Sequence, residues 1–234
     1  MSSYNPGMHG YHHGDLRRAL IDATESLLAE NGPQSFSLRE VARRAGVSPA
    51  APAHHFGDSS GLLTAVAVLA FDELAAALRA GEAHGGRDPR RRLLEQGVAY
   101  VEFAMRYPGR LRLMFGDALR SGDAELGRAG NAAFLVLENG VRAGFGLAEG
   151  EPLPPKAWTA LLALWSVVHG YAHLAIAGRF DPLCGEDARR GEFAAATLRP
   201  VLRAVIEGSV PALSSPAGGA PRGRRAPSRK RASP

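Results

Sequence analysis

The residues of this sequence whose types and spacing could bind a metal or carry out catalysis are histidines. His169 and His173 lie four residues apart, which puts two potential metal ligands on one face of a helix. No carboxylate or cysteine in the same helical turn completes a metal site. The adjacent histidine pairs at 12–13 and 54–55 point apart along an extended chain or a helix, and no nucleophile accompanies them. We therefore expect no catalytic residues, no metal and no cofactor. A helical metal-binding protein or enzyme that uses His169 and His173 stays open as the alternative.

Aromatic, methionine and histidine side chains in the second half of the chain are candidates to line a cavity for a small molecule. Such residues at helical spacing also serve as ordinary core, so both interpretations stay open. The candidate ligand contacts are Phe103, Met114, Phe115, Phe134, Trp165, His169 and His173, with Tyr100, Met105 and Trp158 in the wider set. The histidines would then act as polar handles for a ligand or as structural residues.

The elements that would position a binding surface begin with two short helices between Ser37 and Phe56. Ser37 is followed three residues later by Glu40, the pattern of a reciprocal capping box, and apolar residues then recur at helical spacing. Gly46 suits a left-handed C-terminal cap, and Val47 can fill the angle between the helices. The pattern predicts the first helix of a helix-turn-helix.

A second helix is expected to start immediately after this turn. Ser48 is a good N-cap residue and Pro49 suits the first helical position. On that register Pro52 occupies the fourth helical position and removes the first intrahelical hydrogen bond. The helix should end near Phe56, with small residues and two histidines on the face that would enter a major groove.

From Tyr11 to about Ala70 the chain resembles the N-terminal domain of the TetR family of transcriptional regulators. The resemblance rests on YHHGDLR at 11–17, LLAENG at 27–32, SLREVA at 37–42, AGVS at 45–48, HHF at 54–56 and GLL at 61–63. It implies an all-α fold in which a three-helix DNA-binding head precedes a helical body for ligand binding and dimerisation. The domains expected are the head at 1–60, the body at 61–208 and a tail at 209–234.

The resemblance also implies which residues contact DNA. The family's contacts fall on Ser37, Arg39, Ser48, Pro49, Ala50, Ala53, His54, His55 and Ser59. Arg39 is the candidate for a bidentate contact with guanine or phosphate. His54 is the candidate for contact with a base edge, and His55 for contact with a phosphate. Ala53 replaces the tyrosine usual in the family and Ser59 replaces a lysine, so this chain lacks two of the family's phosphate-binding side chains. A TetR-like protein with reduced specific DNA binding therefore stays open.

Hydrophobic periodicity predicts helices throughout the rest of the chain and no strand. The expected helices cover about 15–31, 59–83, 90–106, 111–115, 123–147, 155–177 and 186–206. The glycine-rich segment before Pro89 separates two of them, and Pro200 either kinks or splits the last.

Residues 165–170 resemble the Trp-x-x-x-His-Gly signature of one TetR subgroup, and residues 113–116 resemble a segment of the same C-terminal domain. In the family, the last two long helices pair with their copies in a second subunit. The helix from Trp158 to Ala177 is apolar nearly all round, so it needs packing partners on more than one side. We expect a homodimer.

Charge and cysteine content agree with a cytoplasmic regulator. Six of the 28 basic residues lie after Ser209 in a segment without acidic residues, so the other 22 face 23 acidic residues. We expect that segment to be disordered, either as a solvated end or as an auxiliary non-specific DNA contact. Cys184 is the only cysteine, which favours a reducing compartment. No export signal is recognised, and no apolar run approaches the ~20 residues that span a bilayer, so no membrane partner is expected.

Together these features predict a ligand-responsive, homodimeric transcriptional regulator, expected to be a repressor. Its partners would be a palindromic double-stranded operator DNA and a small-molecule effector of unknown identity. By analogy with the family, the effector would reposition the helix that follows the recognition helix and so release the DNA.

Overall fold

The computed structural model describes residues 13–32, 36–119, 122–183 and 190–212. Within these ranges the chain is all-α, as predicted, and has no strand. The helices are α1 (His13–Asn31), α2 (Leu38–Ala45), α3 (Ala51–Phe56), α4 (Ser59–His84), α5 (Pro89–Arg106), α6 (Pro108–Met114), α7 (Ala124–Gly144), α8 (Pro155–Ile176) and α9 (Arg190–Ser209). The predicted start of the tail at residue 209 is wrong, because Ser209 ends α9 and Val210 is buried in the body core. The six cationic residues of the tail and Cys184 lie outside the described residues.

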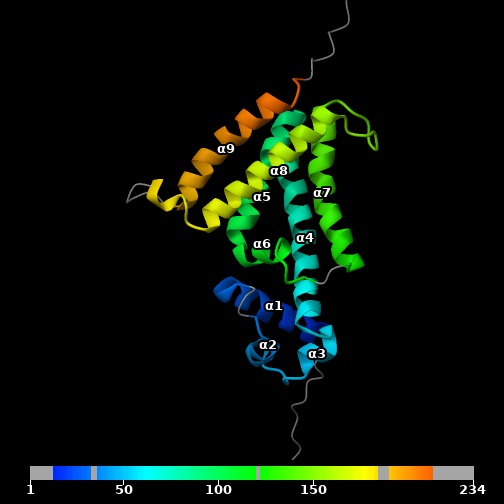
Figure 1. Cartoon of the computed structure of the whole chain (residues 1–234), viewed down its shortest axis with the longest axis vertical. Coiled ribbons are helices and arrows are strands. Elements are labelled where there is room, and N and C mark those ends of the chain that lie inside the picture. The colour runs from blue at the N-terminus through cyan, green and yellow to red at the C-terminus, as the bar shows by residue number, and fades with distance from the viewer. Residues whose placement is uncertain (1–12, 33–35, 120–121, 184–189, 213–234) are drawn as a thin grey trace, which may run out of the picture.

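The head consists of α1, α2 and α3 at one end of the molecule, packed against the first turns of α4 (Figure 1). Leu20 and Leu28 of α1, Val41 of α2 and Leu62 and Val66 of α4 form its fully buried core. Because α2 and α3 are too short to be stable alone, this shared core fixes their positions.

The end of α2 and its N-cap residue Ser37 agree with the sequence, whereas the predicted capping box does not. Gly46 adopts a left-handed conformation with φ of 67°, and its neighbour Val47 donates its N–H to the carbonyl of Ala42 at 3.0 Å. The predicted capping box is wrong, since the Ser37 hydroxyl makes no capping hydrogen bond. The Glu40 carboxylate instead accepts two hydrogen bonds from Arg43, at 2.8 and 2.5 Å. Charge-assisted, paired bonds of this kind are stronger than a bond to a neutral N–H.

The recognition helix α3 begins at Ala51, later than the predicted start at Pro49. Residues 48–50 form a turn, in which the Ala51 N–H donates to the carbonyl of Ser48 at 3.0 Å. The expectation that Pro52 removes an intrahelical bond is therefore wrong. Pro52 is the second residue of α3, where a backbone N–H has no intrahelical partner to lose.

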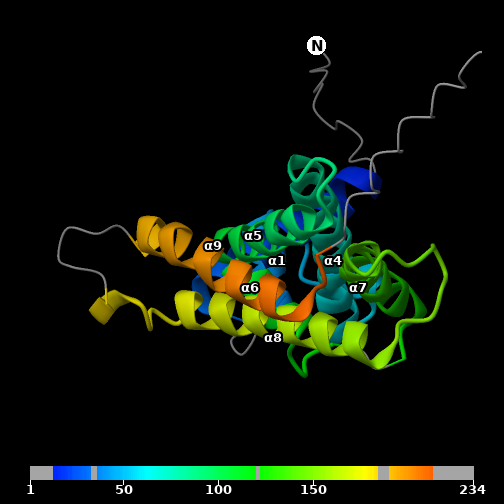
Figure 2. The ribbon, with the colours of Figure 1, turned by 90° about the horizontal axis from the view of Figure 1, so that it is seen from above.

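The body consists of α4 to α9, and α4 connects it to the head (Figure 1). Leu62 and Val66 belong to the head core, whereas Leu74 and Leu78 of the same helix belong to the body core. Helices α5 and α7 pack along α4, and α8 and α9 lie side by side on one flank of the body (Figure 2). A continuous α4 therefore crosses the predicted domain boundary at residue 60.

The long helices α4, α8 and α9 bear on two sequence predictions. Helix α9 is assigned as one helix through Pro200, so it is not split. The expectation that no apolar segment is long enough to span a membrane is wrong. By length and composition alone, α4 and α8 are both long and apolar enough to cross a bilayer. Core helices of water-soluble proteins pass the same test, and both helices contribute residues to the body core.

Candidate DNA-binding surface and effector cavity

Helices α2 and α3 present one exposed face at the end of the head. Of the residues that the sequence assigned to DNA contact, all but His55 have exposed side chains, and His55 is half-buried. They are Ser37, Arg39, Ser48, Pro49, Ala50, Ala53, His54, His55 and Ser59. The structure therefore brings the predicted contacts to one end of the folded molecule, around the turn and the recognition helix.

Most arginines of the head are already paired within the protein. Arg43 pairs with Glu40, and Arg44 makes two hydrogen bonds to Glu30 at 2.6 and 2.8 Å. The bond from Arg44 is the main cause that lowers the pKa of the Glu30 carboxyl. Arg18 pairs with Asp22, and the Arg17 guanidinium lies 5.4 Å from the Phe56 ring centroid.

Arg39 differs from these arginines. It is exposed in the first turn of α2, and it makes no ion pair or hydrogen bond with any residue that the structure describes. Its guanidinium can therefore bind a phosphate or a guanine without first breaking an internal bond.

Helix α6 joins the body to the head through α1. A Cβ atom on Gly109 would lie 2.6 Å from the Leu28 carbonyl oxygen, so only glycine allows this approach of the two backbones. The adjacent Arg110 binds Glu25 of α1 at 2.6 Å and also binds Glu73 of α4. Movement of α6 would therefore act directly on the head.

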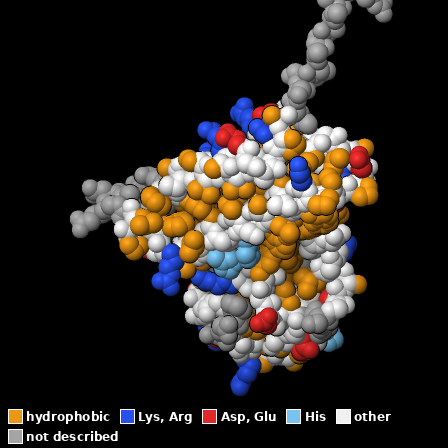
Figure 3. Space-filling view, turned by 45° about the horizontal axis from the view of Figure 1, so that its top comes forward, with side chains coloured by type: hydrophobic (Ala, Val, Ile, Leu, Met, Phe, Trp, Pro, Cys, Tyr) orange, Lys and Arg blue, Asp and Glu red, His pale blue; other side chains and the backbone are white. Residues whose placement is uncertain are grey.

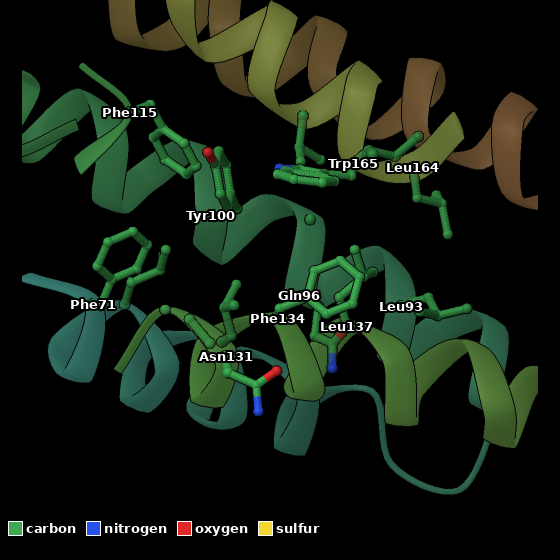
Figure 4. A pocket seen from close by; sticks show the side chains of 17 residues that line it. Phe71, Leu93, Gln96, Tyr100, Phe115, Asn131, Phe134, Leu137, Leu164 and Trp165 are labelled. Atoms are coloured by element: carbon green, nitrogen blue, oxygen red, sulfur yellow. The ribbon is translucent and has the colours of Figure 1, made fainter. Parts of the chain in front are cut away.

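The body contains a cavity of about 410 Å³ between α4, α5, α7 and α8, close to the end of α6. Five aromatic side chains line it, and Figure 4 shows Trp165 of α8 and Phe134 of α7 among the side chains that surround it. These five are Phe71, Tyr100, Phe115, Phe134 and Trp165. The other lining residues are Leu74, Leu78, Leu93, Gln96, Gly97, Gly130, Asn131, Ala133, Leu137, Leu164, Val168 and Leu202. The volume lies in the range of small-molecule sites.

The structure places three of the predicted ligand contacts, Phe115, Phe134 and Trp165, in the lining of this cavity. Phe103 and Met114 lie in the body core outside the lining. His169 and His173 also lie outside it, although the His169 ring is 4.5 Å from the Phe115 ring.

Sequence reasoning missed Phe71, Gln96 and Asn131. The 3.6-residue period marks Phe71 as an inner residue of α4 but cannot show that an empty space lies beside it. The signal available in the sequence was a polar residue, Gln96, on the otherwise apolar face of the helix at 90–106. The structure shows that this residue is buried.

A histidine and a tyrosine meet behind the cavity wall. The Tyr100 hydroxyl lies 2.7 Å from His169 Nδ1. Burial raises the pKa of the Tyr100 hydroxyl. The pKa of His169 is lowered, mainly by burial and secondly by the nearby His173. Both groups are therefore neutral at neutral pH. Among the described residues, no three His, Cys, Asp or Glu side chains are placed to hold a metal ion.

Helix α8 carries an exposed apolar row on its outer face. Trp158, Leu162 and Leu174 are 43, 51 and 48% exposed and are spaced by multiples of four residues. Val201 of the neighbouring α9 is also exposed. Figure 3 shows hydrophobic side chains gathered on this side of the body. Such a surface is typical of a protein interface.

The fold and the exposed α2–α3 face define a helix-turn-helix DNA-binding regulator with a helical body. Residues 20–66 match the family model of bacterial regulatory proteins, tetR family, and residues 93–210 match that of the tetracyclin repressor-like C-terminal domain. The chain belongs to the TetR family of transcriptional regulators. Its place in the Trp-x-x-x-His-Gly subgroup stays a prediction.

Individual relatives resemble the chain over different lengths. The HTH-type transcriptional regulator BetI of Burkholderia ambifaria is 40% identical over 80 residues, which are 34% of this chain and 41% of that protein. A structure of a protein of unknown function from Rhodococcus sp. RHA1 has a TM-score of 0.67 and 33% identity, covering 84% of this chain and 98% of the other. A tetR-family transcriptional regulator from Streptomyces coelicolor has a TM-score of 0.61 and 20% identity, covering 84 and 82%, and supports the fold alone.

Proposed function

We propose that this protein is a ligand-responsive, homodimeric repressor that binds a palindromic operator in the cytoplasm and has no enzymatic activity. The observation that carries the proposal is the unpaired, exposed Arg39 at the start of α2, on a head whose other described arginines have internal partners. The proposed DNA contacts are Arg39, the turn residues Ser48 to Ala50, and the exposed face of α3, with Ser37 and Ser59 at its margins.

The effector response would pass through two helices that reach both the cavity and the head. Helix α4 lines the cavity with Phe71, Leu74 and Leu78, and it buries Leu62 and Val66 in the head. Helix α6 ends at Met114, directly before the cavity residue Phe115, and contacts α1 through Gly109. A ligand that favours a different position of these helices would lower DNA affinity by its preference for that state, with a coupling of ~1–3 kcal/mol.

The exposed face of α8 supports the dimer part of the proposal. A second copy would cover Trp158, Leu162 and Leu174 and thereby remove a large apolar surface from water. A twofold symmetric protein in turn matches a palindromic operator, because each head binds one half-site.

The test is selection of binding sites from a random-sequence duplex library with the full chain, followed by stoichiometry. We expect an enriched inverted repeat bound by two protomers in sedimentation, with much weaker binding to a scrambled duplex. Recovery of no enriched sequence would contradict the proposal. It would favour a TetR-like protein with reduced specific DNA binding, for which the small side chains at Ala53 and Ser59 are the supporting observation.

A metal-binding function for His169 and His173 is the remaining candidate. The two rings lie 4.5 Å apart, but His169 is bonded to Tyr100. Metal analysis of the purified protein distinguishes this candidate, since stoichiometric zinc or iron would support it.

A further inference from the structure

The chemistry of the cavity wall restricts what the cavity can bind. None of the lining residues carries a charged side chain. Burying an ionised group without a partner of opposite charge costs a large free energy. An ionised ligand in this cavity would incur that cost, whereas a neutral one would not.

The buried polar groups of the wall are largely engaged with the protein itself. The Gln96 side chain is 3% exposed, and its amide nitrogen donates to the Val136 carbonyl at 3.1 Å. Its amide oxygen is buried and has no hydrogen-bond partner among the described residues. The Tyr100 hydroxyl is held at 2.7 Å by His169. Asn131 is exposed, and Figure 4 shows its amide directed away from the aromatic rings. The Gln96 amide oxygen is therefore a neutral acceptor for a donor such as a hydroxyl group, whereas no charged side chain of the wall can pair with an ion.

The aromatic side chains give the cavity a shape preference. Phe71 and Phe115 meet edge to face with ring centroids 5.9 Å apart, and Phe134 and Trp165 do so at 5.6 Å. Rings arranged in this way can accept a further flat ring by stacking or by edge contact. Leucine side chains, including Leu93 and Leu164, line the rest of the space and suit an apolar substituent.

We propose that the cavity binds a neutral, largely apolar compound with a planar ring and discriminates against ionised compounds of the same shape. This inference rests on the proposed function only in identifying the cavity as the effector site. The binding itself can be measured without DNA.

Three probes of matched shape test the ligand class by calorimetry on the full chain: naphthylmethanol, which is neutral, naphthoate, which is an anion, and naphthylmethylammonium, which is a cation. We expect naphthylmethanol to bind with a Kd at least about 30-fold lower than that of either ion. Equal binding of an ion, or no binding of naphthylmethanol, would overturn the inference. This comparison uses the unaltered protein and needs no variant to fold.

Two glycines of α7 locate the site. A Cβ on Gly130 would meet only the Phe71 ring, at 3.9 Å, so Gly130→Leu fills the cavity without a clash at its first atom. Gly127, one turn earlier on the same helix, is exposed, lies outside the cavity lining, and has nothing within 4 Å of its Cβ position. Both substitutions favour the helix. Gly130→Leu should lose naphthylmethanol binding and Gly127→Leu should retain it, and retention in both would place the site elsewhere.

A parallel measurement of binding to the selected duplex separates the two proposals. Naphthylmethanol bound without any change in DNA affinity would keep the ligand class and contradict the ligand response. Specific DNA binding by a protein that binds none of the probes would keep the DNA-binding function and contradict the proposed ligand class.

Discussion

At the scale of single residues, Arg39 is the side chain on which DNA binding most depends. Because it is exposed and has no described internal partner, its whole bonding capacity is available to DNA. We expect Arg39→Ala to weaken specific DNA binding by ~1–3 kcal/mol and to leave stability unchanged. Fluorescence anisotropy with the selected duplex measures this effect. Arg79→Ala, an exposed arginine on α4 away from the head, is the control, and an equal weakening in both variants would contradict the assignment.

His169 should make the stability of the protein depend on pH. Burial, and then repulsion from His173, lower its pKa in the folded chain, so below a pH of about 6.5 the unfolded chain binds more protons. Stability from this group is complete above pH ~6.5 and is lost as the pH falls through the lowered pKa of the folded state.

The thermal midpoint should therefore decrease when the pH is lowered from 7.5 to 5.5, which is roughly one unit on either side of the ordinary histidine pKa. The decrease should be smaller in His169→Gln. His54→Gln, at an exposed position, should keep the drop of the unaltered protein. The same pH dependence in all three proteins would show that other groups cause it.

At the scale of elements, the packing of α6 on α1 depends on the absence of one side chain. The Cβ of an alanine at Gly109 would lie 2.6 Å from the Leu28 carbonyl oxygen, and backbone cannot move aside as a flexible side chain can. We expect Gly109→Ala to destabilise the protein by ~1–3 kcal/mol despite the better helix propensity of alanine.

Urea unfolding measures this effect, and Gly127→Ala is the matched control. Its Cβ has open space, so that variant should gain up to ~1 kcal/mol. If Gly109→Ala were as stable as the control, α6 and α1 would not be held as closely as the structure has them.

At the scale of the whole molecule, the exposed row on α8 should hold two protomers together. Leu162 is 51% exposed, so an aspartate there is tolerated in a monomer but would be buried and unpaired in a dimer. Leu162→Asp should raise the dimer dissociation constant at least ~100-fold while the protomer stays folded.

Sedimentation and circular dichroism measure the two parts of this prediction. Leu135→Asp on α7, 39% exposed, is the control and should remain dimeric. A wild-type protein that is monomeric at micromolar concentration would refute the dimer itself.

The segment after Pro221 should add non-specific affinity for DNA. In residues 1–60 five arginines face six carboxylates, whereas the last thirteen residues contain six cations and no acid. Deleting residues 222–234 should lower affinity for selected and random duplexes alike and reduce the log–log salt slope by about 0.9 for each phosphate that the segment neutralises. Sequence preference should survive. An unchanged salt slope would show that the segment does not bind DNA.

The sequence by itself determined the helices and the helix-turn-helix, because caps, glycine conformations and the 3.6-residue period depend on residues within one or two turns. The left-handed Gly46 and the break between α4 and α5 are such local features, and both were predicted. The same local rules failed for the capping-box hydrogen bonds at Ser37 and for the start of the recognition helix at Pro49. Ser37 still precedes α2 as its N-cap, but the Glu40 carboxylate binds Arg43, and the turn at 48–50 moves the start of α3 to Ala51.

Only the tertiary structure decided which side chains are available to partners. The sequence shows five arginines in the head, and it is the packing of α1 against α2 that pairs Arg44 with Glu30, while Arg39 keeps no described partner. Likewise, the sequence shows aromatic residues, but their division between core and cavity depends on how α4, α5, α7 and α8 are spaced. These outcomes depend on interactions between residues far apart in the chain, which no local pattern encodes.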